Sequence, residues 1–287
     1  MSSRRDGFTL VELLIAIVMM TLVGGVVFAL LNSTQRVSTA QAERMLMQSS
    51  IRTGALVVPA ELREIATNTA GQTDLMQISA DSVTYRAARG LGFTCAVTAT
   101  QIKILNSGVL PFSGLRAISP GRDSLLLFVD NNPDSRTDDI WVRLPITSVA
   151  TTTCGTQSAI AVNTPSFLAL LPGGLLSTVI VGGPVRTEEV MRLKSYASGG
   201  EQWVGVASLS GGDAVQPILG PITAGGFTLT YLDGTGAVTA VRDSVRMIQM
   251  QLIGVTERRV ARGGVTGANV LLQDTLVTRV MLRNSPR

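Results

Sequence analysis

The chain has 287 residues, of which 45% are hydrophobic and 15% are charged, and its formal net charge is +4. It contains no histidine, which excludes Ser-His-Asp and Cys-His catalysis and histidine metal sites. The small positive charge argues against nucleic acid as a partner, and the length allows one large globular domain or two small ones.

The first element is a short basic segment, residues 1–7, which ends in glycine and precedes an apolar run from Phe8 to Leu31. The run is longer than the ~20 apolar residues that span a bilayer, and Glu12 is its single charged residue. A glutamate inside hydrocarbon costs roughly 2.5–3.5 kcal/mol. Cleavage between Gly7 and Phe8 creates an ammonium group four residues before Glu12, and residues at i and i+4 share one helix face. Glu12 then has a cationic partner, either on its own chain or on a neighbouring helix.

The sequence GFTLVELLIA at residues 7–16 resembles the prepilin leader of type IV pilins and type II secretion pseudopilins. The resemblance implies that a prepilin peptidase cleaves after Gly7 and methylates Phe8, and that Glu12 directs assembly with other pilin subunits. It places the protein in the bacterial inner membrane, anchored by residues 8–31 with its head in the periplasm, and afterwards in a pilus or pseudopilus filament. No cofactor is expected.

Two other kinds of N-terminal segment have a similar composition. A secretory signal peptide has a shorter apolar region with a small residue after it, whereas here Gly7 precedes the run. A plain membrane anchor explains the length of the run and a cytoplasmic position of Arg4 and Arg5. It explains neither Glu12 nor the junction between Gly7 and Phe8, so we favour the pilin interpretation.

Residues 32–66 predict an amphipathic continuation of the same helix. Apolar residues recur every three or four positions, at Val37, Ala40, Met47, Ile51, Ala55, Val58, Leu62 and Ile65, with Arg44 in the same stripe. We expect this stripe to pack on a globular head, and we expect Pro59 to kink or interrupt the helix near its end.

Residues 67–287 predict a β-rich globular head, so the expected fold is α+β, with a long N-terminal helix packed on an antiparallel sheet. Short alternating segments predict strands at residues 76–86, 100–105, 124–130, 140–146, 176–182, 201–209, 227–233, 237–242, 245–255 and 275–283. Hydrophobic residues alternate with polar ones, as in strands with one wet face, at Ile248, Met250 and Leu252 and at Leu276, Val280 and Leu282. The C-terminal order, from YLDGTG through SVRMIQMQL to MLRN, is similar to W-type minor pilins and J-type pseudopilins.

The two cysteines, Cys95 and Cys154, are expected to form a disulfide if the head lies in an oxidising compartment. Two buried thiols are the alternative. The bond would close a loop of about 60 residues and stabilise the fold by about 4 kcal/mol in the chain-entropy model.

One acidic loop is a weak candidate for calcium. It contains Asp130, Asp134, Asp138 and Asp139, and calcium takes oxygen ligands of this kind. The loop lacks the glycine and the later glutamate of an EF-hand, and its residues are equally typical of a solvated turn. We therefore expect no metal site, and this loop is the one weak candidate.

Two further charged groups carry no predicted site. Arg258, Arg259 and Arg262 form a basic cluster without interleaved aromatic residues, which favours a solvated face over DNA binding. Glu188 and Glu189 are adjacent, so their side chains point apart in a strand and make a poor acid–base pair.

Together these features predict a minor pilin or pseudopilin with a structural, non-catalytic role. A membrane-anchored enzyme is disfavoured because the sequence contains no catalytic constellation. A pilus-borne adhesin or DNA-binding module is compatible with the main interpretation, and both a type IV pilus and a type II secretion pseudopilus fit the sequence.

Overall fold

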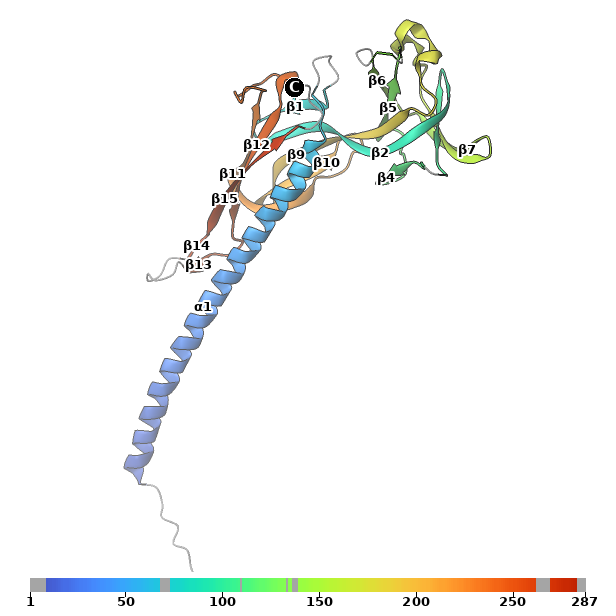
Figure 1. Cartoon of the computed structure of the whole chain (residues 1–287). Helices are drawn as coiled ribbons and strands as arrows, with labels where there is room; N and C mark the ends of the chain where they lie inside the picture. The colour runs from blue at the N-terminus through green and yellow to red at the C-terminus, as the bar shows by residue number, and fades with distance from the viewer. Residues whose placement is uncertain are drawn as a thin grey trace, which may run out of the picture.

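The computed structural model describes residues 9–67, 73–108, 110–132, 134–135, 139–261 and 269–282. It confirms the predicted α+β class: one long helix, α1 (Leu10–Arg63), carries a head built on antiparallel strands. The helix projects from the head like a rod and has its N-terminal half free of the head (Figure 1). At 1.5 Å per residue, its 54 residues extend roughly 80 Å.

The helix is one unbroken element, so of the two predicted effects of Pro59, a kink or an interruption, the interruption is wrong. α1 continues through Pro59 to Arg63, although a proline inside a helix loses a hydrogen bond and costs about 3 kcal/mol. The residues around and after it offset that cost by burial, since Pro59, Leu62 and Ile65 all lie against the head.

The predicted apolar stripe is confirmed for its second half only. Met47, Ile51, Val58, Leu62 and Ile65 are buried against the head, whereas Val37 and Arg44 are exposed. The first buried residue of the helix is Glu43, and the part of the helix before it projects away from the head (Figure 1).

The strands form one large sheet and a small hairpin. Their bounds are β1 (Leu75–Ile78), β2 (Ser82–Thr98), β3 (Gln101–Leu105), β4 (Ser113–Gly114), β5 (Asp123–Val129), β6 (Ile140–Pro145), β7 (Ser148–Cys154), β8 (Gln157–Asn163), β9 (Pro184–Ser198), β10 (Glu201–Ser208), β11 (Gln216–Leu232), β12 (Met247–Val255), β13 (Val260–Ala261), β14 (Asn269–Val270) and β15 (Gln273–Met281). The sheet order is β15-β12-β11-β10-β9-β2-β3-β8-β7, and β5 pairs with both β9 and β6. Short 3-10 turns lie at Leu168–Leu170, Pro172–Gly174, Leu176–Thr178 and Arg242–Ser244.

The head has two hydrophobic cores, which define two lobes. The first lobe packs α1 onto β10, β11, β12 and β15, while the second lobe encloses residues of β3, β5, β6, β8 and the 3-10 turns. The long strands β2 and β9 connect the lobes (Figure 1). Val185 of β9 belongs to the second core, and Met191 and Leu193 of the same strand belong to the first.

The alternation predicted for the C-terminal strands is confirmed. Ile248, Met250 and Leu252 of β12 are fully buried, and Val280 of β15 lies opposite Ile248 in register. In contrast, residues 176–182 and 237–242 are not strands. The first segment forms a 3-10 turn and a loop that cover the second core, and the second makes one isolated bridge, at Val238. Short apolar runs bounded by glycine fit a covering loop as well as a strand.

Close packing of α1 on the sheet depends on two glycines. A Cβ atom at Gly54 of the helix would lie 1.9 Å from Leu219 Cδ2, and one at Gly254 of β12 would lie 2.4 Å from Ile51 Cδ1. A larger residue at either position would therefore have to displace the Leu219 or the Ile51 side chain from its place between the helix and the sheet.

Candidate functional site: the N-terminal helix and the charged seam

The helix begins with a capping box formed by Thr9 and Glu12. The Thr9 hydroxyl accepts the Glu12 N–H at 3.3 Å, and Glu12 Oε2 accepts both the Thr9 N–H and its hydroxyl at 3.1 Å. This arrangement pairs two donors that a helix N-terminus would leave unsatisfied. It also holds the Glu12 carboxylate at the N-terminal end of the helix, where the positive end of the helix dipole favours a negative charge.

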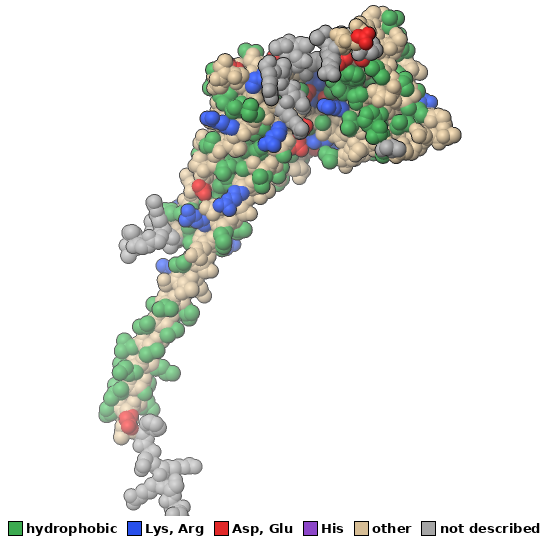
Figure 2. All heavy atoms as spheres, in the orientation of Figure 1, with side chains coloured by type: hydrophobic (Ala, Val, Ile, Leu, Met, Phe, Trp, Pro, Cys, Tyr) green, Lys and Arg blue, Asp and Glu red, His purple; other side chains and the backbone are tan. Residues whose placement is uncertain are grey.

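No other described part of the chain packs against the apolar segment after Glu12. Among the described residues, α1 is the one helix that is long and apolar enough to cross a membrane, and none of that apolar stretch is buried. Hydrophobic side chains line the free half of the rod on the face that Figure 2 shows. An exposed apolar surface of this size requires lipid or other apolar helices around it.

The family model described as "Prokaryotic N-terminal methylation motif" matches residues 2–28. No curated protein and no solved structure matches the chain. The match and the exposed helix confirm that the chain carries the prepilin-type signature, and they support a protein of the type IV pilin or pseudopilin type. Proteins with this signature are structural subunits that a prepilin peptidase processes and that assemble with other pilins.

The structure places the other predicted site residues as follows. Gly7 and Phe8 lie outside the described residues. Cys95 of β2 and Cys154 of β7 form a disulfide with their Cα atoms 6.3 Å apart. The bond ties the tip of the β7–β8 hairpin to the long strand that both lobes share.

The acidic loop is described in part, because Asp138 lies outside the described residues. Within the described part of the chain, no group of three or more acidic or cysteine side chains is arranged to hold a metal ion. Of the basic cluster, Arg258 lies 3.8 Å from Glu43 of α1 and is largely exposed, and Arg262 falls outside the described residues.

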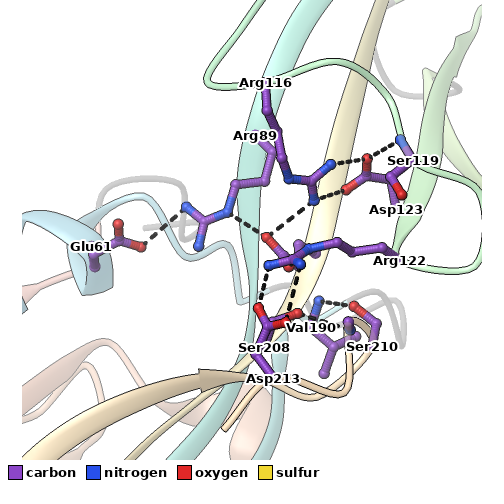
Figure 3. A network of polar contacts seen from close by, with 12 residues as sticks. Glu61, Arg89, Arg116, Ser119, Arg122, Asp123, Val190, Ser208, Ser210 and Asp213 are labelled. Carbon is purple, nitrogen blue, oxygen red and sulfur yellow. Dashed lines mark hydrogen bonds and ion pairs between the residues drawn. The ribbon is translucent and has the colours of Figure 1, made fainter. Parts of the chain in front are cut away.

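A buried charged seam between the two lobes was missed by the sequence analysis. Glu188 and Glu189 lie on β9 between the two cores, and both are buried. Figure 2 shows charged side chains in the region between the two lobes. Their side chains point apart, as a strand requires, and each is paired with arginines. Glu189 binds Arg89 at 3.0 Å, Arg116 at 3.3 Å and Arg122 at 2.5 Å (Figure 3).

The seam joins elements that are distant in sequence. Arg89 of β2 also reaches Glu61 of α1 at 3.5 Å, and Arg116 also binds Asp123 of β5 at 2.6 Å (Figure 3). Burial opposes the ionisation of Glu189, but hydrogen bonds from Ser208 and the arginines hold its pKa below the usual range. Removal of one partner from such a buried network costs about 3–5 kcal/mol, so the seam holds α1 and the two lobes in one arrangement.

The opposite face of β9 has a second cluster of charged side chains. Glu188 binds Arg143 and lies 3.9 Å from Arg86, and Asp74 lies 3.2 Å from Arg143. Burial raises the pKa of Asp74 to about 6, with a further contribution from nearby Glu188, although the carboxylate accepts the Ala66 N–H at 2.9 Å. Asp74 therefore takes up a proton on folding near pH 5.

We expect Asp74→Asn to change the pH dependence of stability. Because the pKa of Asp74 is higher in the folded chain than its ordinary 3.8, the free energy of unfolding falls as the pH rises from about 4 to about 6, by at most about 3 kcal/mol. The substitution should remove this loss, so that the stability of the variant relative to the wild type is greater at pH 7.5 than at pH 4.5. Thermal unfolding of the detergent-solubilised full chain at both pH values measures the difference. Asp134→Asn, in an exposed loop, is the control and should follow the wild type.

Proposed function

We propose that this protein is a structural minor subunit of a type IV pilus or of a related secretion pseudopilus. Residues Phe8–Leu31 anchor it in the inner membrane with the head in the periplasm. A prepilin peptidase then removes residues 1–7 and methylates Phe8, and the mature chain enters a filament. The observation that carries the proposal is Glu12, a single carboxylate at the start of an uncovered apolar helix inside the methylation motif.

The capping box supports a role for Glu12 in docking between subunits. Among the described residues, the hydrogen bonds of its carboxylate come from uncharged donors of Thr9, and no counter-ion from that part of the chain lies at this end of the helix. In a low-dielectric surrounding, an ion pair is strong and an unpaired carboxylate is costly. The ammonium of an adjacent subunit provides the positive charge and sets the register between two helices.

The size and construction of the head favour a minor subunit over the main building block. Two cores, a disulfide and one large antiparallel sheet give a large, rigid body at the end of the rod. Such a head suits a terminal or exposed position, which agrees with the similarity to W-type and J-type proteins. We propose a non-catalytic role for it.

Mass spectrometry of the mature protein from its native cells tests the proposal. We expect the chain to begin at Phe8 and to carry one additional methyl group. Gly7→Leu should abolish cleavage because the added side chain occupies the position that the motif reserves for glycine. Ser3→Leu, which adds the same bulk elsewhere in the leader, should be processed normally. A native chain that still begins at Met1 would contradict the proposal.

A further inference from the structure

The strand β9 has one side in the cores of the head and another side that points away from them. Val185 points into the second core, and Met191 and Leu193 point into the first core, which also contains the buried residues of α1. Side chains alternate along a strand, so the even-numbered residues lie on the side away from α1. We call this side the outer face of β9, and it carries Arg186, Glu188, Arg192, Lys194 and Tyr196.

Both tryptophans of the chain lie on the outer face. Trp141 of β6 lies beside Arg186, whose guanidinium carbon is 5.1 Å from the centre of the Trp141 ring. Trp203 of β10 is paired in register with Tyr196. All three rings are partly exposed. Ten residues of extended strand separate Arg186 from Tyr196, which is about 33 Å, so aromatic rings are available at both ends of the face.

Three cations of the outer face have no carboxylate partner among the described residues. Arg186 is exposed and stacks on Trp141, and Arg192 donates hydrogen bonds to two uncharged side chains. Lys194 is partly exposed, and the ion pairs of the described residues involve none of these three cations. Each cation is therefore available to an anionic partner.

The middle of the outer face is already neutralised. Glu188 binds Arg143 and lies 3.9 Å from Arg86, and Asp74 lies 3.2 Å from Arg143. Two carboxylates thus balance two guanidinium groups there, and Glu201 adds one carboxylate at the tip of the β9–β10 hairpin. The available positive charge is divided into two groups, one at each end of the face, and each group lies near aromatic rings.

This division fits a polymer with spaced charges better than a polymer that is charged at every unit. A nucleic acid carries one phosphate per nucleotide on each strand, so it would place phosphates over the neutralised middle. In an acidic polysaccharide, carboxylates are separated by uncharged sugar surface. The carboxylates suit arginine and lysine, and the apolar C–H faces of the sugar rings suit exposed aromatic rings.

We propose that the outer face of β9 binds an acidic polysaccharide that contains uronic acids. Its sugar rings pack on the aromatic rings at the two ends, and its carboxylates pair with Arg186, Arg192 and Lys194. Since α1 packs on the opposite side of the sheet, the face points away from the helices at the centre of a filament. That position rests on the proposed function, whereas the binding itself does not.

Tryptophan fluorescence of the detergent-solubilised full chain measures the binding, because both tryptophans lie on the outer face. The probes are alginate, which is a polyuronate, dextran as an uncharged polysaccharide, and oligo(dT) as a nucleic acid. Alginate should change the emission in a saturable way at low salt, and more weakly at roughly 0.2 M salt, which screens exposed charges. Dextran and oligo(dT) should bind at least roughly ten-fold more weakly.

A double substitution tests the cations. Arg186→Gln together with Lys194→Gln removes one available cation from each end and should weaken alginate binding roughly ten-fold, the effect of two exposed ion pairs. Arg44→Gln together with Arg52→Gln is the matched control, since it removes the same charge from exposed positions on α1. The control should bind alginate like the wild type.

The two tryptophans test both ends of the face separately. Trp141→Phe and Trp203→Phe each keep an aromatic ring and leave one fluorescent reporter. Alginate should change the emission of both variants, and a response at one end alone overturns the proposed site. These two variants decide the matter if the double substitution at Arg186 and Lys194 does not fold.

Protease resistance and an intact bond between Cys95 and Cys154 show which variants are folded. The proposal is overturned if the wild type does not bind alginate, if oligo(dT) or dextran binds as tightly, or if both double variants lose the same affinity. Normal cleavage after Gly7 without alginate binding would overturn this inference and leave the proposed function intact. An uncut N-terminus with alginate binding would do the reverse.

Discussion

Sheared filaments from cells that make Glu12→Ala or Glu12→Gln should contain at least ten-fold less of this protein than wild-type filaments. Both substitutions remove the negative charge that we assign to docking. The attraction of two unit charges 4 Å apart is about 4 kcal/mol at an effective dielectric constant of 20, so a ten-fold loss is a conservative expectation. Cleavage after Gly7 should be unaffected. Immunoblots of the filament and membrane fractions measure the first effect, and the mass of the mature chain measures the second.

The capping box provides the control that separates charge from helix capping. Glu12→Gln keeps a side chain that can complete a capping box, and Thr9→Ala removes the capping hydroxyl while it keeps the charge. Thr9→Ala costs about 1 kcal/mol of helix stability at most positions of this kind and should assemble far better than Glu12→Gln. If Glu12→Gln assembled normally and Thr9→Ala did not, Glu12 would act as a cap and the docking mechanism would be wrong.

Gly54→Leu should loosen the helix from the head and destabilise the folded chain by about 2–3 kcal/mol, in the range of overpacked cores. A side chain at this position collides with Leu219 of β11, whose Cγ and Cβ atoms would lie 3.0 and 3.1 Å from the new Cβ. Helix propensity acts in the opposite direction, because leucine is favoured over glycine by about 1 kcal/mol. Urea unfolding of the detergent-solubilised chain measures the net effect.

Gly25→Leu is the matched control for Gly54→Leu. A Cβ atom at Gly25 has no neighbour within 4 Å among the described residues, so the same substitution brings the gain in helix propensity without a collision. It should leave the unfolding of the head unchanged. Equal effects of the two substitutions would show that the helix backbone does not approach the sheet as closely as the structure indicates.

Periodicity predicted the elements whose environment is uniform along their length. The helix was recognised because its apolar residues follow a single spacing from Val37 to Ile65, of which the part from Met47 onward packs on the head. The strand β12 was recognised because Ile248, Met250 and Leu252 alternate with polar residues. Both elements lie on one core with one wet face, so the pattern and the environment agree. The loop at residues 176–182 has the composition of a buried strand, but it covers the second core without joining the sheet.

The strand β9 shows where local patterns give no prediction. Its central residues, Glu188 and Glu189, were predicted only to point apart, and both are buried. Their burial is possible because five arginines from β2, β6 and the loop before β5 surround them. The nearest useful signal in the sequence was a pair of glutamates within a β-rich region unusually rich in arginine, which predicts pairing without identifying the partners.

The sequence by itself determined the features that depend on neighbours a few residues apart: the methylation motif, the apolar helix, the position of Glu12 at its start, and the faces of the C-terminal strands. Only the tertiary structure decided the division of the head into two cores, the charged seam around Glu189 and the close contact between Gly54 and Leu219. These features arise from residues separated by tens to hundreds of positions, whose distances are set by the sheet order, and no local spacing encodes that order.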